Sequence, residues 1–490
     1  MTPPLHLSDT ETAFVTLLDS FAKQQDPPVE CRIAGGWVRD KLLSLPSSDL
    51  DIALSIPSGH GFAVNFVDFL KTKNIPTGSV GKVVANPDQS KHLETGTTRI
   101  MGLECDFVGL RSETYAESRI PQVKSGTPLE DASRRDLTIN ALFYNVHTKQ
   151  VEDYTERGLS DLESKIARTP LAPRQTFHDD PLRIIRCVRF ASRFDLTIAP
   201  EVVEVIRQED VKAGILIKVS KERIGIEVTK MLHQNPFEAM CLIDSLGLHP
   251  YIFNCDVDPP RHDAIASAQI LRHLLEREDV DDVLWLATAV TPFRGLTVER
   301  KGKHIPACVA VISEGLKLST ELKLSVANLF EAAKRIDPEA TKRSEIGSCL
   351  QHQTVRPWQR SLTWAIVMNI LPIWKGHWNN ETEIVYNRYQ KFRERIVAQG
   401  IDDAIDKPLL LNGNDIQRLL SIPPSSLITT IRQSLNAWQL DNPNSNKADC
   451  EAWLQGMWDG EGRAHWELNS SAPMQNGRKH RDNKGEKRKR

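Results

Sequence analysis

GGWVRDKLLSLPSSDLDIAL, residues 35–54, combines a Gly-Gly turn, a basic helix start and a strand that carries two acids. Successive side chains of a strand point to opposite faces, so Asp49 and Asp51 share one face while Leu50 and Ile52 occupy the other. Two carboxylates this close repel each other unless a cation lies between them. Mg²⁺ takes oxygen ligands from one or two carboxylates plus substrate phosphates, and glycines let backbone N–H groups approach a phosphate. The stretch therefore predicts a metal-dependent site for a nucleoside triphosphate.

The composition is that of a soluble globular protein with several domains. The 490 residues are 40% hydrophobic and 26% charged, and the formal net charge is −2. A charge this close to zero argues against polyanion binding over the whole surface, so any nucleic-acid surface is expected to be local. The eight cysteines include no Cys-x-x-Cys pair, which favours reduced thiols over a disulfide framework or a zinc site.

Neither a membrane span nor an N-terminal secretory or transit signal is predicted. Residues 1–14 lack the apolar core of a secretory signal and the Arg-rich make-up of a transit peptide. The apolar run at residues 364–374 contains Asn369 and Pro372 and is too short to cross a bilayer. We expect a location in the cytoplasm and nucleus, with a mitochondrial pool left open. Residues 471–490 are expected to be a disordered basic tail, suited to nuclear import, RNA contact or solubility.

The chain divides into a small α+β part and a helical part. Strands are predicted at residues 49–55, 103–110 and 141–146 and helices at 36–44 and 61–71, which indicates a small mixed sheet with helices on one face. No strand is predicted after residue 151, and helices are predicted at 181–194, 221–233, 264–277, 322–336 and 362–370. The predicted domains are an N-terminal extension (1–29), a head (30–150), a neck (151–235), a helical body and tail (236–470) and the basic tail (471–490).

A third acid is predicted to join the first two. In LECDFVGLR, residues 103–111, Asp106 shares a strand face with Glu104. An acid on a neighbouring strand is what a two-metal site for in-line displacement needs. A lone Asp-x-Asp is more often a solvated strand, and the preceding GGWVRD is what favours a site.

A basic cluster follows in DASRRDLTINALFYN, residues 131–145. Arg134 and Arg135 suit neutralisation of phosphate charge, and Asp136 is expected to orient one of the guanidinium groups. The apolar residues that follow would be a buried strand or helix that fixes the cluster in place.

A helix is predicted in HDDPLRIIRCVRFASRF, residues 178–194, where Asp180 and Arg183 would meet on one face. A carboxylate only accepts hydrogen bonds and a guanidinium only donates them, so this pair matches the Watson–Crick edge of both cytosine and adenine. Uracil and guanine present the opposite order and would leave buried groups unpaired, at ~1–3 kcal/mol each. Arg186 and Arg189 continue the stripe and are predicted to be free for triphosphate oxygens. An exposed i,i+3 ion pair is the other interpretation of the same spacing.

Together these clusters resemble the class II CCA-adding tRNA nucleotidyltransferases of eukaryotic, particularly fungal, type, within the polymerase-β-like nucleotidyltransferase superfamily. GGWVRD with DLD is similar to their metal-binding motif A, and RRDLTINALFYN to motif B. Motif C, the linker on which the head pivots, is resembled by RGLSDLESKIART. Motif D, the amino-acid template, is resembled by DDPLRIIRCVRFASRF. Motif E, which supports the template helix, is resembled by VSKERIGIEVTKML. SKHLETGTTR, residues 90–99, lies where the family has a flexible loop. Five motifs in the family's order over ~200 residues are far more specific than a single match.

The resemblance implies addition and repair of the 3′-terminal CCA of tRNA from CTP and ATP, at one site and without a nucleic-acid template. The palm-like head would catalyse attack of the tRNA 3′-hydroxyl on the α-phosphate, with release of pyrophosphate. The implied roles are Mg²⁺ binding by Asp49 and Asp51 with Asp106 as a third catalytic carboxylate, nucleotide binding by Gly36, Arg39, Arg135 and Asp136, base reading by Asp180 and Arg183, and assistance from Arg186 and Arg189. The implied partners are the acceptor and T arms of tRNA, Mg²⁺ is the implied cofactor, and we expect a monomer.

Three other functions fit parts of the sequence. A relative with partial activity would add only CC or only the terminal A, and the loop at residues 90–99 favours full activity. A poly(A) polymerase would have to reject CTP, for which the Asp–Arg pair offers no means. A catalytically inactive RNA-binding protein would gain nothing from acids clustered beside an RNA phosphate. Ser425-Ser426 stands where the family often has Gly-Pro, so the RNA contacts of the tail are not predicted.

Overall fold

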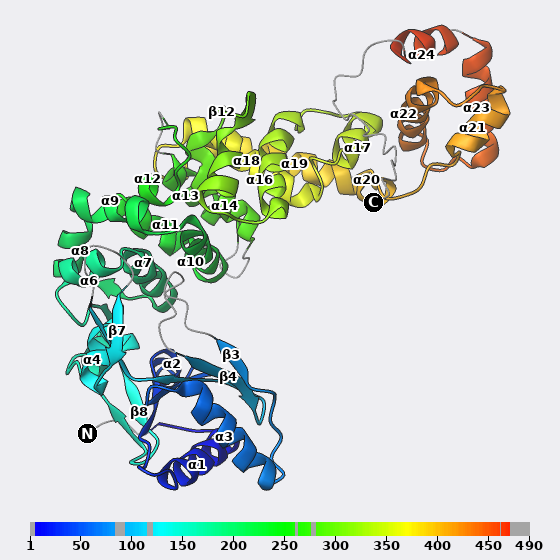
Figure 1. Ribbon diagram of the computed structural model, residues 1–490. Helices are drawn as coiled ribbons and strands as arrows, with labels where there is room; N and C mark the ends of the chain where they lie inside the picture. The colour runs from blue at the N-terminus through cyan, green and yellow to red at the C-terminus, as the bar shows by residue number, and fades with distance from the viewer. Residues whose placement is uncertain are drawn as a thin grey trace, which may run out of the picture. The chain divides into compact units, whose positions relative to one another are not determined.

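The computed structural model describes residues 5–83, 94–114, 121–259, 263–275, 281–460 and 462–470 (Figure 1). These residues fall into two compact units, Met1–Ala327 and Asn328–Arg490. Two predicted features lie outside the described residues: the first part of the loop at 90–99, and the basic tail at 471–490.

A mixed sheet of seven strands forms the head, in the order β3-β4-β5-β2-β1-β8-β9. Only β2 and β5 are parallel, and the other neighbours in the sheet are antiparallel. The strands are β1 (Cys31–Ala34), β2 (Asp49–Leu54), β3 (Gly81–Val83), β4 (Thr95–Ile100), β5 (Leu103–Gly109), β8 (Phe143–Asn145) and β9 (Gln150–Glu152). The predicted mixed sheet is confirmed, and the three predicted strands are correct to within two residues at each end.

Helices α1 (Asp9–Lys23) and α3 (Gly59–Thr72) cover one face of this sheet (Figure 1). The ring of Phe66 lies 5.2 Å from that of Phe21 and 6.0 Å from that of Phe107, between ring centroids, so both helices and β5 share one aromatic core. The prediction that residues 1–29 form an extension apart from the head was wrong for α1, because this helix packs in the core of the head. Amphipathic α1 completes the core of the head.

The opposite face of the sheet carries the acids of β2 and β5 and is bordered by shorter elements. These are α2 (Gly36–Leu42), the hairpin β6 (Arg111–Thr114) and β7 (Gln122–Ser125), α4 (Pro128–Ser133) and the 3₁₀ turn η2 (Thr138–Asn140). Ala53, Ala132 and Phe143 form a small buried cluster on this side, which fixes α4 and the segment after it against the sheet.

The rest of the first unit is mainly helical and packs without a second large sheet. Its elements are α5 (Gly158–Glu163), β10 (Ile166–Ala167), α6 (Pro173–Asp179), α7 (Leu182–Phe194), β11 (Thr197–Ile198), α8 (Pro200–Ile206), α9 (Glu209–Lys218), α10 (Lys221–Gln234), α11 (Pro236–Ser245), α12 (His249–Ile252), α13 (Ala264–Leu274), α14 (Asp282–Val290), η3 (Thr291–Phe293), β12 (Thr297–Arg300), β13 (Lys303–Pro306), α15 (Ala307–Ala310) and η4 (Val311–Gly315). The predicted domain boundary at residue 235 therefore falls inside one compact unit.

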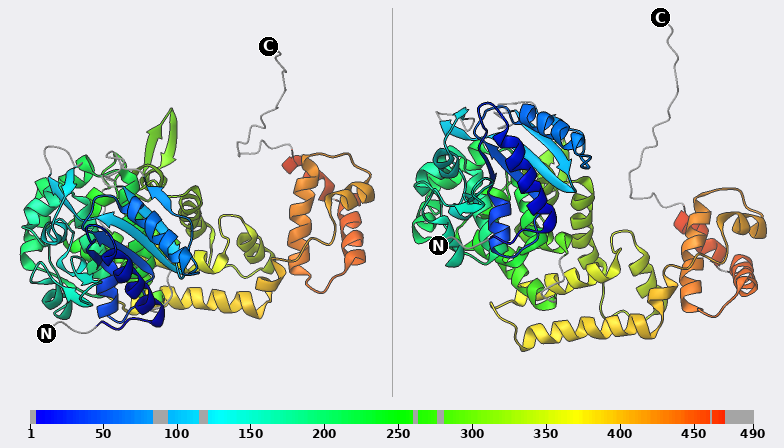
Figure 2. Two further views of the ribbon diagram at one scale, coloured as in Figure 1. Left: turned by 60° about the horizontal axis from the view of Figure 1, so that its bottom comes forward. Right: turned by 90° about the horizontal axis from the view of Figure 1, so that it is seen from below.

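Helix α16 (Thr320–Arg335) contains the division between the units, and the second unit is helical throughout its described part. Its elements are α17 (Arg343–Gln351), α18 (Trp358–Ile370), η5 (Leu371–Ile373), α19 (Asn380–Ala398), α20 (Ile401–Ala404), α21 (Gly413–Leu420), α22 (Ser426–Asp441), α23 (Lys447–Asp459) and α24 (Gly462–Ser470). The last four helices gather around Leu411, Ile431, Leu454 and Trp466 (Figure 2).

The prediction of no strand after residue 151 was wrong in detail. Strands β10 and β11 pair in parallel, and β12 and β13 form a hairpin. Two-residue strands are too short to show alternation, and charged residues hide the alternation of the hairpin. Its turn uses Lys301 and Gly302, both with positive φ (51° and 72°), a conformation that hairpin turns favour.

Within the described ranges, no helix is both long and apolar enough to cross a membrane. All eight cysteines lie in the described part of the chain, where none forms a disulfide, and six of them are buried.

Candidate active site

Strands β2 and β5 place three acids on the face of the sheet away from α1 and α3. The parallel register sets Asp51 opposite Asp106 and Asp49 opposite Glu104. Leu50 and Ile52 are buried on the other face, as the alternation predicts. We call Asp49, Asp51 and Asp106 the carboxylate edge, and the structure brings the three together as expected.

The carboxylate edge holds charges of one sign at close range. Asp51 is open to a cavity but ringed by protein, and this loss of bulk water raises its pKa. Arg135 opposes the effect, while Asp106 and Asp49 add to it. The raised pKa of Asp51 means that the protein alone does not fully compensate its negative charge.

This donor set fits a hard divalent cation. The described residues include no group of three or more His, Cys, Asp or Glu side chains that could hold a metal ion by themselves. Mg²⁺ does not require three protein ligands, because it keeps several waters and is commonly bound by one or two carboxylates plus substrate phosphates. Asp51 and Asp106 line the cavity, and Asp49 is exposed on the same face of β2 as Asp51, so these three acids are the residues suited to hold it.

The cavity in front of the carboxylate edge has a volume of about 670 Å³ and is lined mainly by charged groups. All the predicted site residues except Asp49 line it. The charged lining consists of nine arginines and six carboxylates: Arg39, Arg111, Arg134, Arg135, Arg183, Arg186, Arg189, Arg193 and Arg223, with Asp51, Asp106, Glu113, Asp131, Asp136 and Asp180. An excess of positive groups suits a triphosphate. We call Arg134, Arg135, Arg183, Arg186, Arg189 and Arg223 the arginine wall.

Asp131 of α4 orients the two arginines that follow it. Its carboxylate accepts from Arg134 Nη2 at 2.6 Å and from Arg135 Nη2 at 2.9 Å. Burial alone would raise the pKa of Asp131, but the two guanidinium groups lower it to about 2. The prediction that Asp136 would orient one member of this pair was wrong, because the buried acid one helical turn earlier takes both.

Asp136 instead orients Arg186 of α7. Its carboxylate lies 2.7 Å from Arg186 Nη2 and also accepts from the Asn140 side chain and the Leu137 N–H. Burial opposes ionisation of Asp136, yet Arg186 and these hydrogen bonds lower its pKa to about 2.

Arg189 is paired as well, at 2.5 Å to Glu227 of α10, and Arg186 lies 3.6 Å from the same acid. The prediction that Arg186 and Arg189 are free for triphosphate was therefore wrong for the protein without ligand. Buried guanidinium groups need counter-charges, and these come from residues remote in sequence.

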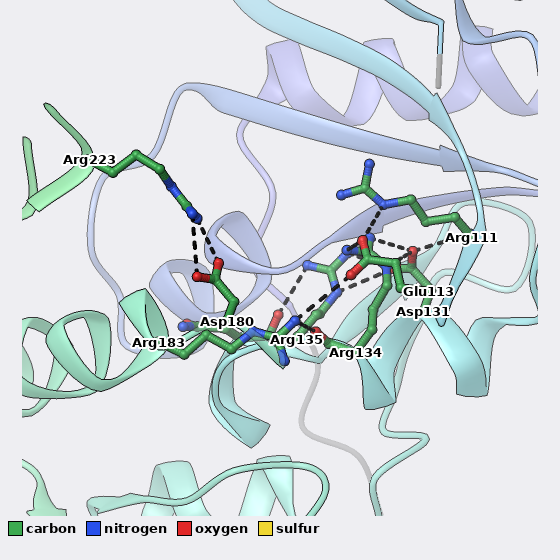
Figure 3. A network of polar contacts seen from close by, with 9 residues as sticks. Arg111, Glu113, Asp131, Arg134, Arg135, Asp180, Arg183 and Arg223 are labelled. Carbon is green, nitrogen blue, oxygen red and sulfur yellow. Dashed lines mark hydrogen bonds and ion pairs between the residues drawn. The ribbon is translucent and has the colours of Figure 1, made fainter. Parts of the chain in front are cut away.

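The base-reading pair differs most from its prediction. Asp180 ends α6 with an extended backbone (φ −141°, ψ 100°), because a residue before proline avoids the helical conformation. Its carboxylate pairs with Arg223 of α10, at 2.6 Å, and not with Arg183 (Figure 3). Arg183 donates to the Arg134 carbonyl at 2.6 Å and lies 3.9 Å from Glu113. The two residues line one cavity but do not form the predicted i,i+3 contact on one helix.

The Gly-Gly turn before α2 brings backbone close to the arginine wall. Gly35 has φ +69°, and a Cβ there would lie 2.6 Å from Arg135 Nη1. Gly36 begins α2 and lines the cavity. Arg39 is buried, pairs with Asp40 at 2.7 Å and lies over the ring of Phe194, 4.4 Å from its centroid. The positive φ favours glycine at position 35, whereas the nearest atom, Arg135 Nη1, ends a flexible side chain that could move aside.

Sequence reasoning missed five charged residues of the cavity. They are Arg111, Glu113, Asp131, Arg193 and Arg223. Arg193 could have been found, since it continues the spacing of Arg186 and Arg189 on α7. The other four come from a hairpin, a short helix and a later helix, and no local pattern connects these with the strand acids.

Comparison with known proteins assigns the family. The family model described as the Poly A polymerase head domain matches residues 31–168. The mitochondrial CCA tRNA nucleotidyltransferase of Saccharomyces cerevisiae is 34% identical, over 93% of this chain and 94% of that protein. The chain belongs to the CCA tRNA nucleotidyltransferases. A second relative in this family, tRNA nucleotidyltransferase cca2 of Schizosaccharomyces pombe, is also 34% identical, over 92% of this chain and 98% of that protein.

The fold is likewise that of CCA-adding enzymes. The crystal structure of the Bacillus stearothermophilus CCA-adding enzyme in complex with CTP matches with a TM-score of 0.63 and 20% identity, over 94% of this chain and all of that one. The family resemblance and the α+β fold inferred from the sequence are thus confirmed, and the chain is a tRNA nucleotidyltransferase.

Proposed function

We propose that this tRNA nucleotidyltransferase adds C, C and then A to the 3′ end of tRNA at a single site, using CTP and ATP. The observation that carries the proposal is that Asp180 and Arg183 line the same cavity as Asp51 and Asp106. A nucleotide whose base is held by Asp180 and Arg183 can therefore present its α-phosphate to the carboxylate edge.

Base choice would follow from the donor and acceptor character of Asp180 and Arg183. The carboxylate accepts from the amino group of cytosine or adenine, and the guanidinium donates to the adjacent ring nitrogen. Uracil and guanine would place an acceptor against the carboxylate and a donor against the guanidinium, which leaves both groups unpaired. One pair can thus serve both nucleotides without a nucleic-acid template.

The transfer step is an in-line displacement at the α-phosphate. The tRNA 3′-oxygen bonds to the α-phosphorus, the bond to the oxygen bridging to the β-phosphate breaks, and the hydroxyl proton leaves as pyrophosphate departs. Asp49 and Asp51, with Asp106 as a third carboxylate, would hold Mg²⁺, which when bound stabilises the attacking and leaving oxygens. Arg135, Arg186 and Arg189 of the arginine wall would bind the triphosphate and keep its α-phosphate in position, together with Gly36 and Arg39 beside them.

The acceptor and T arms of tRNA are the proposed macromolecular partner, recognised through shape and phosphate contacts. A relative covering nearly the whole chain is named as mitochondrial, which supports a mitochondrial pool in addition to the predicted cytoplasmic and nuclear ones. Immunolocalisation of the tagged protein, together with fractionation, tests all three compartments.

The decisive experiment gives the full chain and Mg²⁺ two tRNA substrates, one ending before the first C and one ending after CC, with each labelled nucleotide in turn. We expect two additions of CTP and one of ATP. ATP added only to the CC-ended tRNA would indicate an A-adding relative, and CTP alone a CC-adding one. Repeated addition of ATP would indicate a poly(A) polymerase, and no incorporation a binding protein.

The same assay tests the base-reading role. Asp180→Ala is expected to lose discrimination between CTP and UTP while still responding to Mg²⁺. Glu222→Ala, an exposed acid on α10, is the control and should retain discrimination. Unchanged selectivity in Asp180→Ala would refute base reading by this residue.

A further inference from the structure

The carboxylate of Asp180 is held by Arg223, an arginine 43 residues later in the chain. Arg223, in the first turn of α10, donates from Nη1 to Oδ1 at 3.3 Å and from Nη2 to Oδ2 at 2.6 Å (Figure 3). The backbone N–H of Leu182 donates to Oδ1 at 3.2 Å. Three donors from two segments, the first turn of α10 and the start of α7, therefore fix the plane and direction of this carboxylate.

The contacts leave room for one more donor. An ionised carboxylate has about four acceptor positions, two on each oxygen. Among the described residues, Oδ1 receives two donors and Oδ2 only one. The remaining position is on Oδ2, on the side chain that lines the cavity, and an exocyclic amino group needs one such acceptor.

We propose that Arg223 is a specificity-determining positioning residue, which fixes the Asp180 carboxylate so that it accepts one amino group from C or A and excludes the carbonyl of uracil. The proposal rests on base reading by Asp180, as set out under the proposed function. Arg223 acts through Asp180 and does not itself read the base. Because a guanidinium only donates, its partner carboxylate stays an acceptor.

The structure favours an Arg223 that stays in place over one that the nucleotide displaces. Helix α10 is seated closely, since a Cβ at Gly225 would lie 1.9 Å from the Leu316 carbonyl oxygen. Ile224 and Val228 are buried beneath it. The pair is itself shielded, with 30% and 17% of the Arg223 and Asp180 side chains exposed. Displacement would leave both charges without partners, which is costlier than adding one donor to a free acceptor position.

Loss of Arg223 should therefore affect base choice more than nucleotide binding. Without it, Asp180 keeps only the Leu182 N–H, and its carboxylate can rotate or take a bridging water. We expect Arg223→Met to reduce the ratio of CTP to UTP incorporation by about tenfold, with a smaller change in KM for CTP. Arg223→Lys keeps the charge but not the two-pronged contact, so we expect an intermediate ratio.

The test measures kcat and KM for CTP and UTP with the full chain. Lys230→Met is the matched control, since it removes an exposed cation from the same helix. Melting temperature and tRNA affinity are measured for each variant, and Arg223→Lys carries the test if Arg223→Met does not fold. In the Asp180→Ala background, Arg223→Met should lower the CTP:UTP ratio no further, which a purely structural role would not produce.

Several outcomes would overturn the inference. The first is an unchanged CTP:UTP ratio in Arg223→Met. The second is tighter binding of both nucleotides by that variant, which would mean that Arg223 competes with the nucleotide for Asp180. The third is that Arg223→Met lowers the CTP:UTP ratio as much in the Asp180→Ala background as in the unmodified chain. If the unmodified chain does not discriminate CTP from UTP, the proposed function fails. If it does, and Asp180→Ala loses the discrimination while Arg223→Met keeps it, only this inference fails.

Discussion

The carboxylate edge and the arginine wall face each other across one cavity but differ in how their charges are compensated. Asp131, Asp136, Glu227 and Asp180 pair with the arginines, and the first two have pKa values lowered to about 2. In the carboxylate edge, burial raises the pKa of Asp51, and Asp106 and Asp49 add to the effect while Arg135 opposes it. The arginines of the wall are therefore largely paired within the protein, whereas the negative charge of Asp51 is left for the proposed cation to compensate. Loss of an acid that pairs the wall should affect folding, and a change in the edge should affect chemistry.

The largest expected effect comes from Asp51→Asn. Removing one ligand of a group that stabilises transition-state charge should lower nucleotide incorporation by about 10³-fold or more. Stability without divalent metal should stay equal or rise, because an uncompensated charge has been removed. Single-turnover incorporation and melting temperature, each with and without Mg²⁺, measure both effects.

Asp68→Asn serves as the control for that variant. Asp68 lies on α3, its side chain is 64% exposed, and its one ion pair is with Lys71. A loss of stability in Asp51→Asn similar to that of a buried ion-pair variant would contradict the contrast between edge and wall.

The second effect is on folding, from Asp136→Asn. The change leaves Arg186 without its closest counter-charge in a buried network, at about 3 kcal/mol of unfolding free energy. Urea denaturation measures it against Asp195→Asn, which breaks an exposed pair with Lys165 (86% and 61% exposed) and should cost well under 1 kcal/mol. An equal loss of unfolding free energy in the two variants would mean that the ion pairs of the wall stabilise the fold no more than an exposed ion pair does.

The smallest effect is the difference in pH dependence between the two regions. The folded pKa of Asp136 is below its unfolded value, so its stabilisation is present above about pH 4 and is lost as the pH falls towards 2, by about 2 kcal/mol. Asp51 has the opposite sign: its raised pKa means that the ionised form destabilises the fold and protonation on acidification relieves this. Without metal, we compare the unfolding free energy of each variant with that of the unmodified chain. As the pH falls, the difference for Asp51→Asn should disappear before the difference for Asp136→Asn does.

Unfolding curves at a series of pH values give both gaps. The gap for Asp136→Asn should persist to about pH 4 and then shrink. If the two stability differences disappear over the same pH range, Asp51 and Asp136 have similar environments, and the contrast between edge and wall is wrong.

Sequence reasoning succeeded where the information is local. Alternation in β2 and β5 located Asp51 and Asp106, and composition and periodicity separated the mixed-sheet head from the helices. It could not supply partners, because Arg223 lies 43 residues from Asp180 and Arg186 lies 50 from Asp136. The i,i+3 argument for Asp180 and Arg183 failed at Pro181, which ends one helix before the next begins.

The register of β2 and β5 has a consequence for how this family can change over time. Asp51 lies opposite Asp106 through the same parallel pairing that builds the centre of the sheet. Inserting or deleting one residue within either strand would turn its acids into the core and its apolar residues outwards. Length variation must therefore be confined to connections such as residues 43–48, while the spacing between ligands is inherited from the backbone. Length changes in the connections leave this register intact, so the distance across the carboxylate edge is fixed by the backbone pairing itself.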